Sequence, residues 1–137
     1  MKIIKKTAII MLLCIYFLIY GVLPQVQAAG RETPLIVVAH RAGAKVAPEN
    51  TIAALEQSIR DGVPIAEIDV QQLSDGTLIV MHDNNFKRTA GEDICVWDAD
   101  VEMLRELEVG SAFSDAYRGE QIPTLEEMLA CARAESD

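Results

Sequence analysis

The hydrophobic pattern beyond the N-terminal segment alternates between short apolar runs and amphipathic stretches. Residues 35–39, LIVVA, form a continuous apolar run, which is typical of a strand covered on both faces in a parallel sheet. Pro64 opens the run IAEIDVQQ at residues 65–72, and TLIVM follows at residues 77–81. The turn residues Ser74-Asp75-Gly76 separate these two runs, so the pattern predicts two further strands joined by a tight turn.

Residues 51–62, TIAALEQSIRDG, have the period of an amphipathic helix. Their apolar side chains Ile52, Leu55 and Ile59 fall on one stripe. Asn50 or Thr51 can cap the N-terminus, and Gly62 supplies the C-terminal stop.

A second helix is predicted at residues 124–134, after a long polar stretch that covers roughly residues 84–121. Thr124 and Glu127 have the spacing of a capping box, and the apolar side chains of Leu125, Met128 and Leu129 lie on one side. The order strand, helix, strand with an embedded hairpin, and helix is the beginning of an α/β fold.

The N-terminal residues 1–28 have the layout of a secretory signal. Three lysines precede an almost wholly apolar run at residues 7–23, and the small residues Val26 and Ala28 suit cleavage after Ala28. The alternative is a retained membrane anchor, because the run is longer than usual for a signal and close to the minimum for spanning a bilayer. We therefore expect an exported protein, extracellular or periplasmic, whose domain occupies residues 29–137 and whose membrane contact is limited to residues 7–23 if these are not cleaved.

The net charge of the chain limits the kinds of molecule that it can bind. Without residues 1–28 the chain has 9 basic and 21 acidic residues, a net charge of −12. Such a surface repels nucleic acid and anionic lipid headgroups, and it is compatible with a hard cation held by carboxylates. Cys95 and Cys131 could form a disulfide in an exported protein, but their predicted segments give this pairing no geometric support.

Candidate catalytic groups follow the predicted strands. The only two histidines, His40 and His82, come after residues 35–39 and 77–81. Glu67 and Asp69 stand at alternate positions of the strand between them, so we expect both to point to one face. Burying two carboxylates together is costly unless a cation neutralises them, and their oxygens suit Mg²⁺ or Ca²⁺. The alternative is a strand with one solvated face.

Arg41 supplies a planar fork of donors that suits a phosphate group. The small residues that follow it, Ala42, Gly43 and Ala44, leave room for a ligand to approach. Together these signals gather acid/base groups, carboxylates and a phosphate donor at strand C-termini, where α/β barrels keep their active sites.

As an ordered set, the motifs resemble the glycerophosphodiester phosphodiesterase family: His40-Arg41, Pro48-Glu49-Asn50-Thr51, Glu67-Ile68-Asp69-Val70, Asp75-Gly76, His82-Asp83, Arg88-Thr89 and Ile122-Pro123-Thr124-Leu125. The resemblance implies a TIM (β/α)₈ barrel that hydrolyses small-molecule glycerophosphodiesters to glycerol 3-phosphate and an alcohol. A barrel of this type has about 250 residues, so we expect only its first two or so βα units here.

By position, the resemblance implies roles for six residues: His40 and His82 as the general acid/base pair, Glu67 and Asp69 as ligands of a divalent cation (Ca²⁺ or Mg²⁺), Arg41 as the phosphate-binding residue, and Glu49 as a residue that orients Arg41 or the cation site. The family's third carboxylate ligand comes from a strand beyond residue 137. The family usually reads His-Arg-Gly, so Ala42 either lengthens the loop or replaces the glycine. Two alternative functions remain open: a phospholipase D-like relative that acts on lysophospholipids, and a truncated, non-catalytic product.

Overall fold

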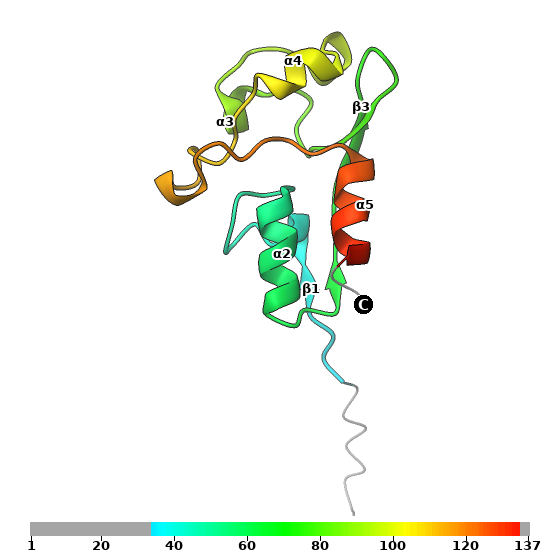
Figure 1. Cartoon of the computed structure of the whole chain (residues 1–137), viewed down its shortest axis with the longest axis vertical. Helices are drawn as coiled ribbons and strands as arrows, with labels where there is room; N and C mark the ends of the chain where they lie inside the picture. Colours follow the sequence, from blue (N-terminus) through cyan, green and yellow to red (C-terminus); the bar gives the residue numbers. More distant parts are fainter. Residues whose placement is uncertain (1–33, 135–137) are drawn as a thin grey trace, which may run out of the picture. The chain divides into compact units, whose positions relative to one another are not determined.

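The computed structural model describes residues 34–134, and the predicted signal or anchor lies outside them. None of the helices in this part of the chain is long and apolar enough to cross a membrane. The elements follow one another in this order (Figure 1): β1 (Val38–Ala39), η1 (His40–Ala42), α2 (Ile52–Arg60), β2 (Ile65–Ala66), β3 (Val70–Gln72), β4 (Leu78–Val80), α3 (Lys87–Ala90), η2 (Val96–Asp98), α4 (Val101–Arg105), η3 (Asp115–Tyr117) and α5 (Leu125–Ala134).

The predicted strand at residues 65–72 is two short strands in the structure. β2 pairs in parallel with β1, whereas β3 pairs antiparallel with β4. The break lies at residues 67–69, where the backbone changes partner. The Glu67 N–H donates to the Ala39 carbonyl at 2.9 Å, and the Asp69 carbonyl accepts from the Met81 N–H at 2.9 Å. Glu67 and Asp69 therefore lie between two strand pairs rather than within one strand.

The apolar run at residues 35–39 is not covered on both faces, contrary to the sequence-based expectation. Leu35 is 92% exposed and Val38 is 48% exposed. β1 belongs to a sheet of two strands, and residues 34–134 supply no second layer over these side chains.

Helix α2 forms as predicted, with Thr51 as its N-cap. The Thr51 hydroxyl oxygen accepts from the Ala54 N–H at 3.2 Å, which satisfies one of the free donors of the first turn. Gly62, at a φ of 70°, follows the last turn in the left-handed conformation that ends many helices. Asn50 is not the cap, and its side chain has a different partner.

Helix α5 begins with the predicted capping box. The Glu127 N–H donates to the Thr124 hydroxyl at 3.2 Å, and the Thr124 N–H donates to the Glu127 carboxylate at 2.8 Å. α5 packs against α2 and β4, and α2 and α5 stand side by side in Figure 1. This packing buries a first core: Ala42, Ala47, Ala54, Leu55, Val80 and Met128.

The stretch at residues 84–121 is more structured than its polar composition indicated. It contains α3, η2, α4 and η3 and contributes most of a second core: Leu73, Ile79, Met81, Phe86, Val96, Ala99, Leu104, Leu107, Val109 and Ile122. Apart from the run ICVW at residues 94–97, its apolar residues stand singly or in pairs among polar ones, so the sequence pattern indicated little of this core. Cys95 is a free thiol and therefore does not pair with Cys131.

The loop after β1 has an unusual backbone. Arg41 and Ala42 have φ angles of 51° and 61°, and Gly43 has a φ of 131°. The departure from His-Arg-Gly thus places a buried alanine in a conformation that favours glycine, with the glycine next in line.

We expect Gly43→Ala to lower the free energy of unfolding by about 2 kcal/mol or more, because overpacking and backbone strain add. A Cβ at Gly43 would lie 2.7 Å from the Ser58 Oγ and 3.1 Å from the Ala54 carbonyl oxygen. Ala42→Gly should stay within about 1 kcal/mol of the wild type, since relief of strain offsets the lost methyl group and the gain in chain freedom. Denaturant unfolding followed by circular dichroism measures both. Equal stability of Gly43→Ala and the wild type would contradict the packing described.

Candidate active site

The loop after β1 holds Arg41 against the segment that carries the two carboxylates. The Arg41 N–H donates to Glu67 Oε2 at 2.8 Å. The Ala42 N–H donates to the Glu67 carbonyl at 2.7 Å, and the Arg41 carbonyl accepts from the Asn50 N–H at 2.8 Å. These bonds fix the left-handed backbone at Arg41 and bring His40, Arg41 and Glu67 to one place.

Two nitrogens of the Arg41 guanidinium, Nη1 and Nε, differ in whether they have a hydrogen-bond partner. Nη1 forms an ion pair with Glu49 Oε1 at 2.9 Å, and Nε lies 3.8 Å from Asp69 Oδ2, too far for a hydrogen bond. Nε is buried and has no hydrogen-bond partner among residues 34–134. A buried donor without a partner costs about 1–3 kcal/mol, which marks Nε as a position for a ligand oxygen.

Asn50 holds Asp69 in place. Its side-chain Nδ2 donates to Asp69 Oδ2 at 2.9 Å, and its Oδ1 accepts from the Asp69 N–H at 3.3 Å. Asn50 is buried and has a φ of 58°, a conformation that asparagine tolerates better than most residues. From the sequence, the only structural role assigned to Asn50 was that of a helix cap, because its spacing to α2 suits a cap and its contact with Asp69 spans 19 residues.

His82 is oriented by its neighbour Asp83. His82 Nδ1 lies 2.7 Å from Asp83 Oδ1, and Asp83 Oδ2 accepts from Arg88 Nε at 2.7 Å. The imidazole is 43% exposed. A histidine held at Nδ1 by a carboxylate is suited to proton transfer at Nε2.

Gln71 fixes the chain that carries His82. Its Nε2 donates to three successive carbonyls, those of Met81 at 3.2 Å, His82 at 2.9 Å and Asp83 at 2.7 Å. The side chain of Gln71, on β3, thereby holds the backbone that follows β4.

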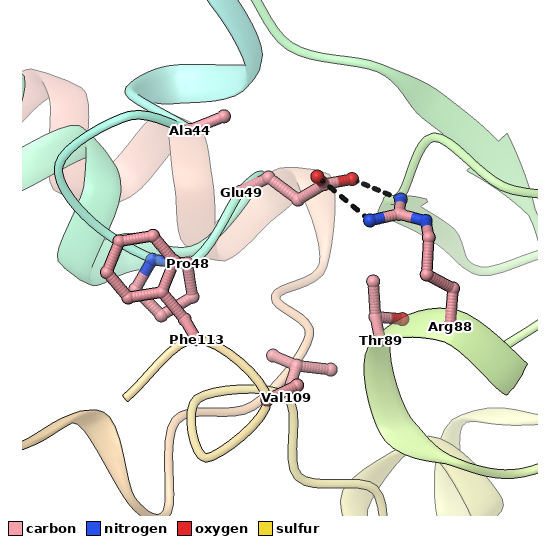
Figure 2. A pocket seen from close by; sticks show the side chains of 8 residues that line it. Ala44, Pro48, Glu49, Arg88, Thr89, Val109 and Phe113 are labelled. Atoms are coloured by element: carbon pink, nitrogen blue, oxygen red, sulfur yellow. Dashed lines mark hydrogen bonds and ion pairs between the residues drawn. The ribbon is translucent and has the colours of Figure 1, made fainter. Parts of the chain in front are cut away.

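Arg88, on α3, joins this part of the site to Glu49. Its Nη2 and Nη1 donate to Glu49 Oε1 at 2.5 Å and Oε2 at 3.1 Å, and Figure 2 shows the two groups facing each other. The pair lies at a cavity of about 230 Å³. The cavity is lined by Ala44, Pro48, Glu49, Arg88, Thr89, Val109, Ala112 and Phe113.

A continuous series of polar contacts thus runs from His82 through Asp83, Arg88, Glu49 and Arg41 to Asp69. With Glu67, it unites five of the six residues selected from the sequence. The side chain of the sixth, His40, is exposed and stands outside the series, directly before Arg41 in the chain. The four carboxylates and two guanidinium groups of this network carry a net charge of −2 when all are ionised.

Ion pairing keeps the network ionised. The hydrogen bond from Arg88, together with His82, lowers the pKa of Asp83 to about 2 against the opposing effect of burial. Burial raises the pKa of Glu49, but hydrogen bonds from Arg88 and Arg41 outweigh it, and the net pKa lies below the ordinary value. Hydrogen bonds to Glu49 and Asp83 raise the pKa of Arg88.

Asp83 and Arg88 belong to the motifs His82-Asp83 and Arg88-Thr89, but the sequence assigned neither of them a role. The available signal was the adjacency of Asp83 to His82, which is the usual arrangement of a base and the group that orients it. Nothing local marks Arg88, because 39 residues separate it from Glu49.

Asp83 should stabilise the fold in a pH-dependent way. Its pKa of about 2 is below the ordinary 3.8, so its contribution is complete above about pH 5 and is lost as the pH falls through about 2. We expect the difference in unfolding free energy between the wild type and Asp83→Asn to shrink between pH 4 and pH 2. Denaturant titrations at several pH values measure it, and a difference that stays constant over this range would contradict the Arg88–Asp83 pairing.

The model of the glycerophosphoryl diester phosphodiesterase family matches residues 40–136. The chain is 41% identical over 94 residues to a glycerophosphodiester phosphodiesterase from Caldanaerobacter subterraneus subsp. tengcongensis, covering 69% of this chain and 39% of that protein. It is 37% identical over 95 residues to human glycerophosphodiester phosphodiesterase 1, covering 68% of this chain and 29% of that protein.

Solved structures give the same assignment. An Oleispira antarctica phosphodiesterase in complex with the product sn-glycerol-3-phosphate has a TM-score of 0.69 and 33% identity, covering 74% of this chain and 41% of that one. A glycerophosphodiester phosphodiesterase from Agrobacterium tumefaciens has a TM-score of 0.68 and 33% identity, covering 72% and 42%. The chain therefore spans about two fifths of the structures that it matches, and the predicted TIM-barrel class is confirmed for the part it shares with them. By this match and by its motifs, the chain belongs to the glycerophosphoryl diester phosphodiesterase family.

Proposed function

We propose that this protein hydrolyses glycerophosphodiesters to glycerol 3-phosphate and an alcohol. The observation that carries the proposal is the buried Arg41 Nε, which has no hydrogen-bond partner among residues 34–134 and lies 3.8 Å from Asp69 Oδ2. A phosphate oxygen would satisfy this donor with a charge-assisted hydrogen bond. The Oleispira antarctica relative holds sn-glycerol-3-phosphate, which supports the choice of substrate class.

His40 and His82 would carry the protons. One takes a proton from the attacking water as its oxygen bonds to phosphorus, and the other gives a proton to the alkoxide as the phosphorus–oxygen bond of the leaving alcohol breaks. For His82, the contact of Nδ1 with Asp83 Oδ1 at 2.7 Å leaves Nε2 as the nitrogen that faces the reaction.

Glu67 and Asp69 would hold a divalent cation, Ca²⁺ or Mg²⁺. Residues 34–134 contain no group of three or more side chains of the metal-binding types placed to hold a metal. Two carboxylates nevertheless fit a hard cation, because Mg²⁺ commonly takes one or two protein carboxylates and completes its shell with water and substrate oxygens. The net charge of −2 in the network also suits a divalent ion. When bound, the cation would neutralise charge that develops on the phosphoryl oxygens.

Export is part of the proposal, supported by the lysines and the apolar run of residues 1–28. Glycerophosphodiesters outside the cell would then be the substrates. A lysophospholipid substrate and a chain that binds without turnover are the competing outcomes of the assay below.

We expect purified chain to release glycerol 3-phosphate from glycerophosphocholine with Mg²⁺ or Ca²⁺, and to lose this activity in EDTA. His40→Ala and His82→Ala should each lower kcat about 10²- to 10⁴-fold, the usual contribution of a general acid or base. Phosphorus NMR follows substrate and product directly, and lysophosphatidylcholine is assayed in parallel.

Circular dichroism establishes that each variant keeps its secondary structure. Turnover that persists in both histidine variants, or none from folded wild-type chain, would overturn the proposed mechanism. Exclusive turnover of lysophosphatidylcholine would favour the phospholipase D-like alternative.

Arg41→Lys should weaken binding of glycerol 3-phosphate about 10- to 100-fold, because lysine loses the fork that serves Glu49 and phosphate at once. Isothermal titration calorimetry measures this without any turnover. Arg60→Lys is a matched control, since Arg60 lies exposed on α2 and its side-chain hydrogen bonds within residues 34–134 go to Glu56 and Gln57. Equal affinity of Arg41→Lys and the control would exclude Arg41 as the phosphate donor.

A further inference from the structure

Arg88 uses three nitrogens on two carboxylates. Nη1 and Nη2 hold the two oxygens of Glu49 at 3.1 and 2.5 Å, and Nε donates to Asp83 Oδ2 at 2.7 Å. Figure 2 shows the fork turned toward Glu49 across the cavity. A guanidinium engaged in this way is fixed in both position and plane, which a lysine ammonium could not reproduce.

Each oxygen of Asp83 has a different task. Oδ1 lies 2.7 Å from His82 Nδ1, and Oδ2 accepts from Arg88 Nε. Without Arg88, Oδ2 has no guanidinium partner and the carboxylate is able to rotate, so Oδ1 is no longer directed at the imidazole. The tautomer of a histidine is set by the partner of one ring nitrogen, and this partner depends on Arg88.

Glu49 depends on the same residue. Its Oε1 is shared between Arg88 Nη2 and Arg41 Nη1, the latter at 2.9 Å. Arg88 therefore links the loop that holds Arg41 to the turn that holds His82, two segments that are separate in the sequence.

An ordinary surface ion pair would look different. Arg105 also forms a two-nitrogen pair, with Glu127 at 2.7 and 3.3 Å, and is 40% exposed against 50% for Arg88. In the described part of the chain, the Arg105 side chain pairs with the single carboxylate of Glu127 and makes no polar contact with the network. Exposed pairs of this kind contribute little to stability, about 0–1 kcal/mol, so any larger effect of Arg88 comes from the groups it positions.

We propose that Arg88 is a positioning residue, which directs Asp83 at His82 Nδ1 so that His82 carries its proton there and presents a bare Nε2 to the substrate. The consequence for catalysis rests on the proposed function, but the state of the imidazole does not.

The test is the tautomer of His82 in the ¹⁵N-labelled full chain, read from long-range ¹H–¹⁵N spectra of the imidazole ring at a pH where the ring is neutral. The chain has two histidines, so His40→Gln assigns the signals. In the wild type we expect Nδ1 to be protonated and Nε2 bare. Arg88→Gln and Arg88→Lys should both give a mixture of tautomers, and Arg105→Gln should match the wild type.

Arg88→Lys keeps the positive charge and guards against a variant that fails to fold. Wild-type signals in folded Arg88→Lys would overturn the proposal, as would an equal change in Arg105→Gln.

Kinetics separate this proposal from the function itself. In an active chain, Arg88→Lys should lower kcat about 10- to 100-fold, as is usual for a residue that orients a catalytic group, with a smaller change in KM. A tautomer change in a chain that hydrolyses no glycerophosphodiester would support Arg88 as a positioning residue and refute the function. Turnover of glycerophosphodiesters together with an unchanged tautomer in Arg88→Lys would support the function and refute Arg88 as a positioning residue.

Discussion

The Glu49 carboxylate, shared between two guanidinium groups, is the interaction on which the rest of the site depends. Its side chain is 20% exposed, and burial alone would oppose its ionisation. Arg41 and Arg88 reverse this effect, and they can lie close together only because a negative charge stands between them. Without Glu49, the two guanidinium groups would repel each other, and each would lose its closest carboxylate partner on this side of the site.

Backbone strain is concentrated where the site is built. Arg41, Ala42 and Asn50 have φ angles of 51°, 61° and 58°, a conformation that costs about 1–2 kcal/mol for Arg41 and for Ala42 and less for asparagine. Hydrogen bonds from the loop to Glu67 and from Asn50 to Asp69 offset this cost. The preference of residues other than glycine for negative φ angles is thus broken at the point where a side chain must be presented to a ligand, as expected of functional sites.

The features predictable from sequence are those set by near neighbours. The capping of α2 by Thr51 and the capping box of α5 rest on contacts across three residues, so spacing alone revealed them. The break within residues 65–72 was not predictable, because it arises where the backbone changes its partner from Ala39 to Met81. Similarly, residue type and position after a strand singled out Arg41 and His82, whereas Arg88 acquires its place only through folding.

Glu49 and Arg88, the pair at the middle of the network, lie in segments that rest on different cores. Glu49 lies between Ala47 and the start of α2, over the first core, whereas Arg88 follows Phe86, which is fully buried in the second.

Packing therefore sets the approximate positions of the two segments, and the ion pairs set the final directions of their side chains. Ion pairs suit this role because they fix geometry although they contribute little net stability.

This arrangement also leaves one donor of Arg41 unpaired. Arg41 Nη1 is occupied by Glu49, while the buried Nε has no hydrogen-bond partner within residues 34–134. In the proposed function, a phosphate oxygen would take the donor at Arg41 Nε and would leave the pair of Arg41 Nη1 with Glu49 in place. A site prepared in this way avoids the cost of rearranging its own charges when the substrate arrives.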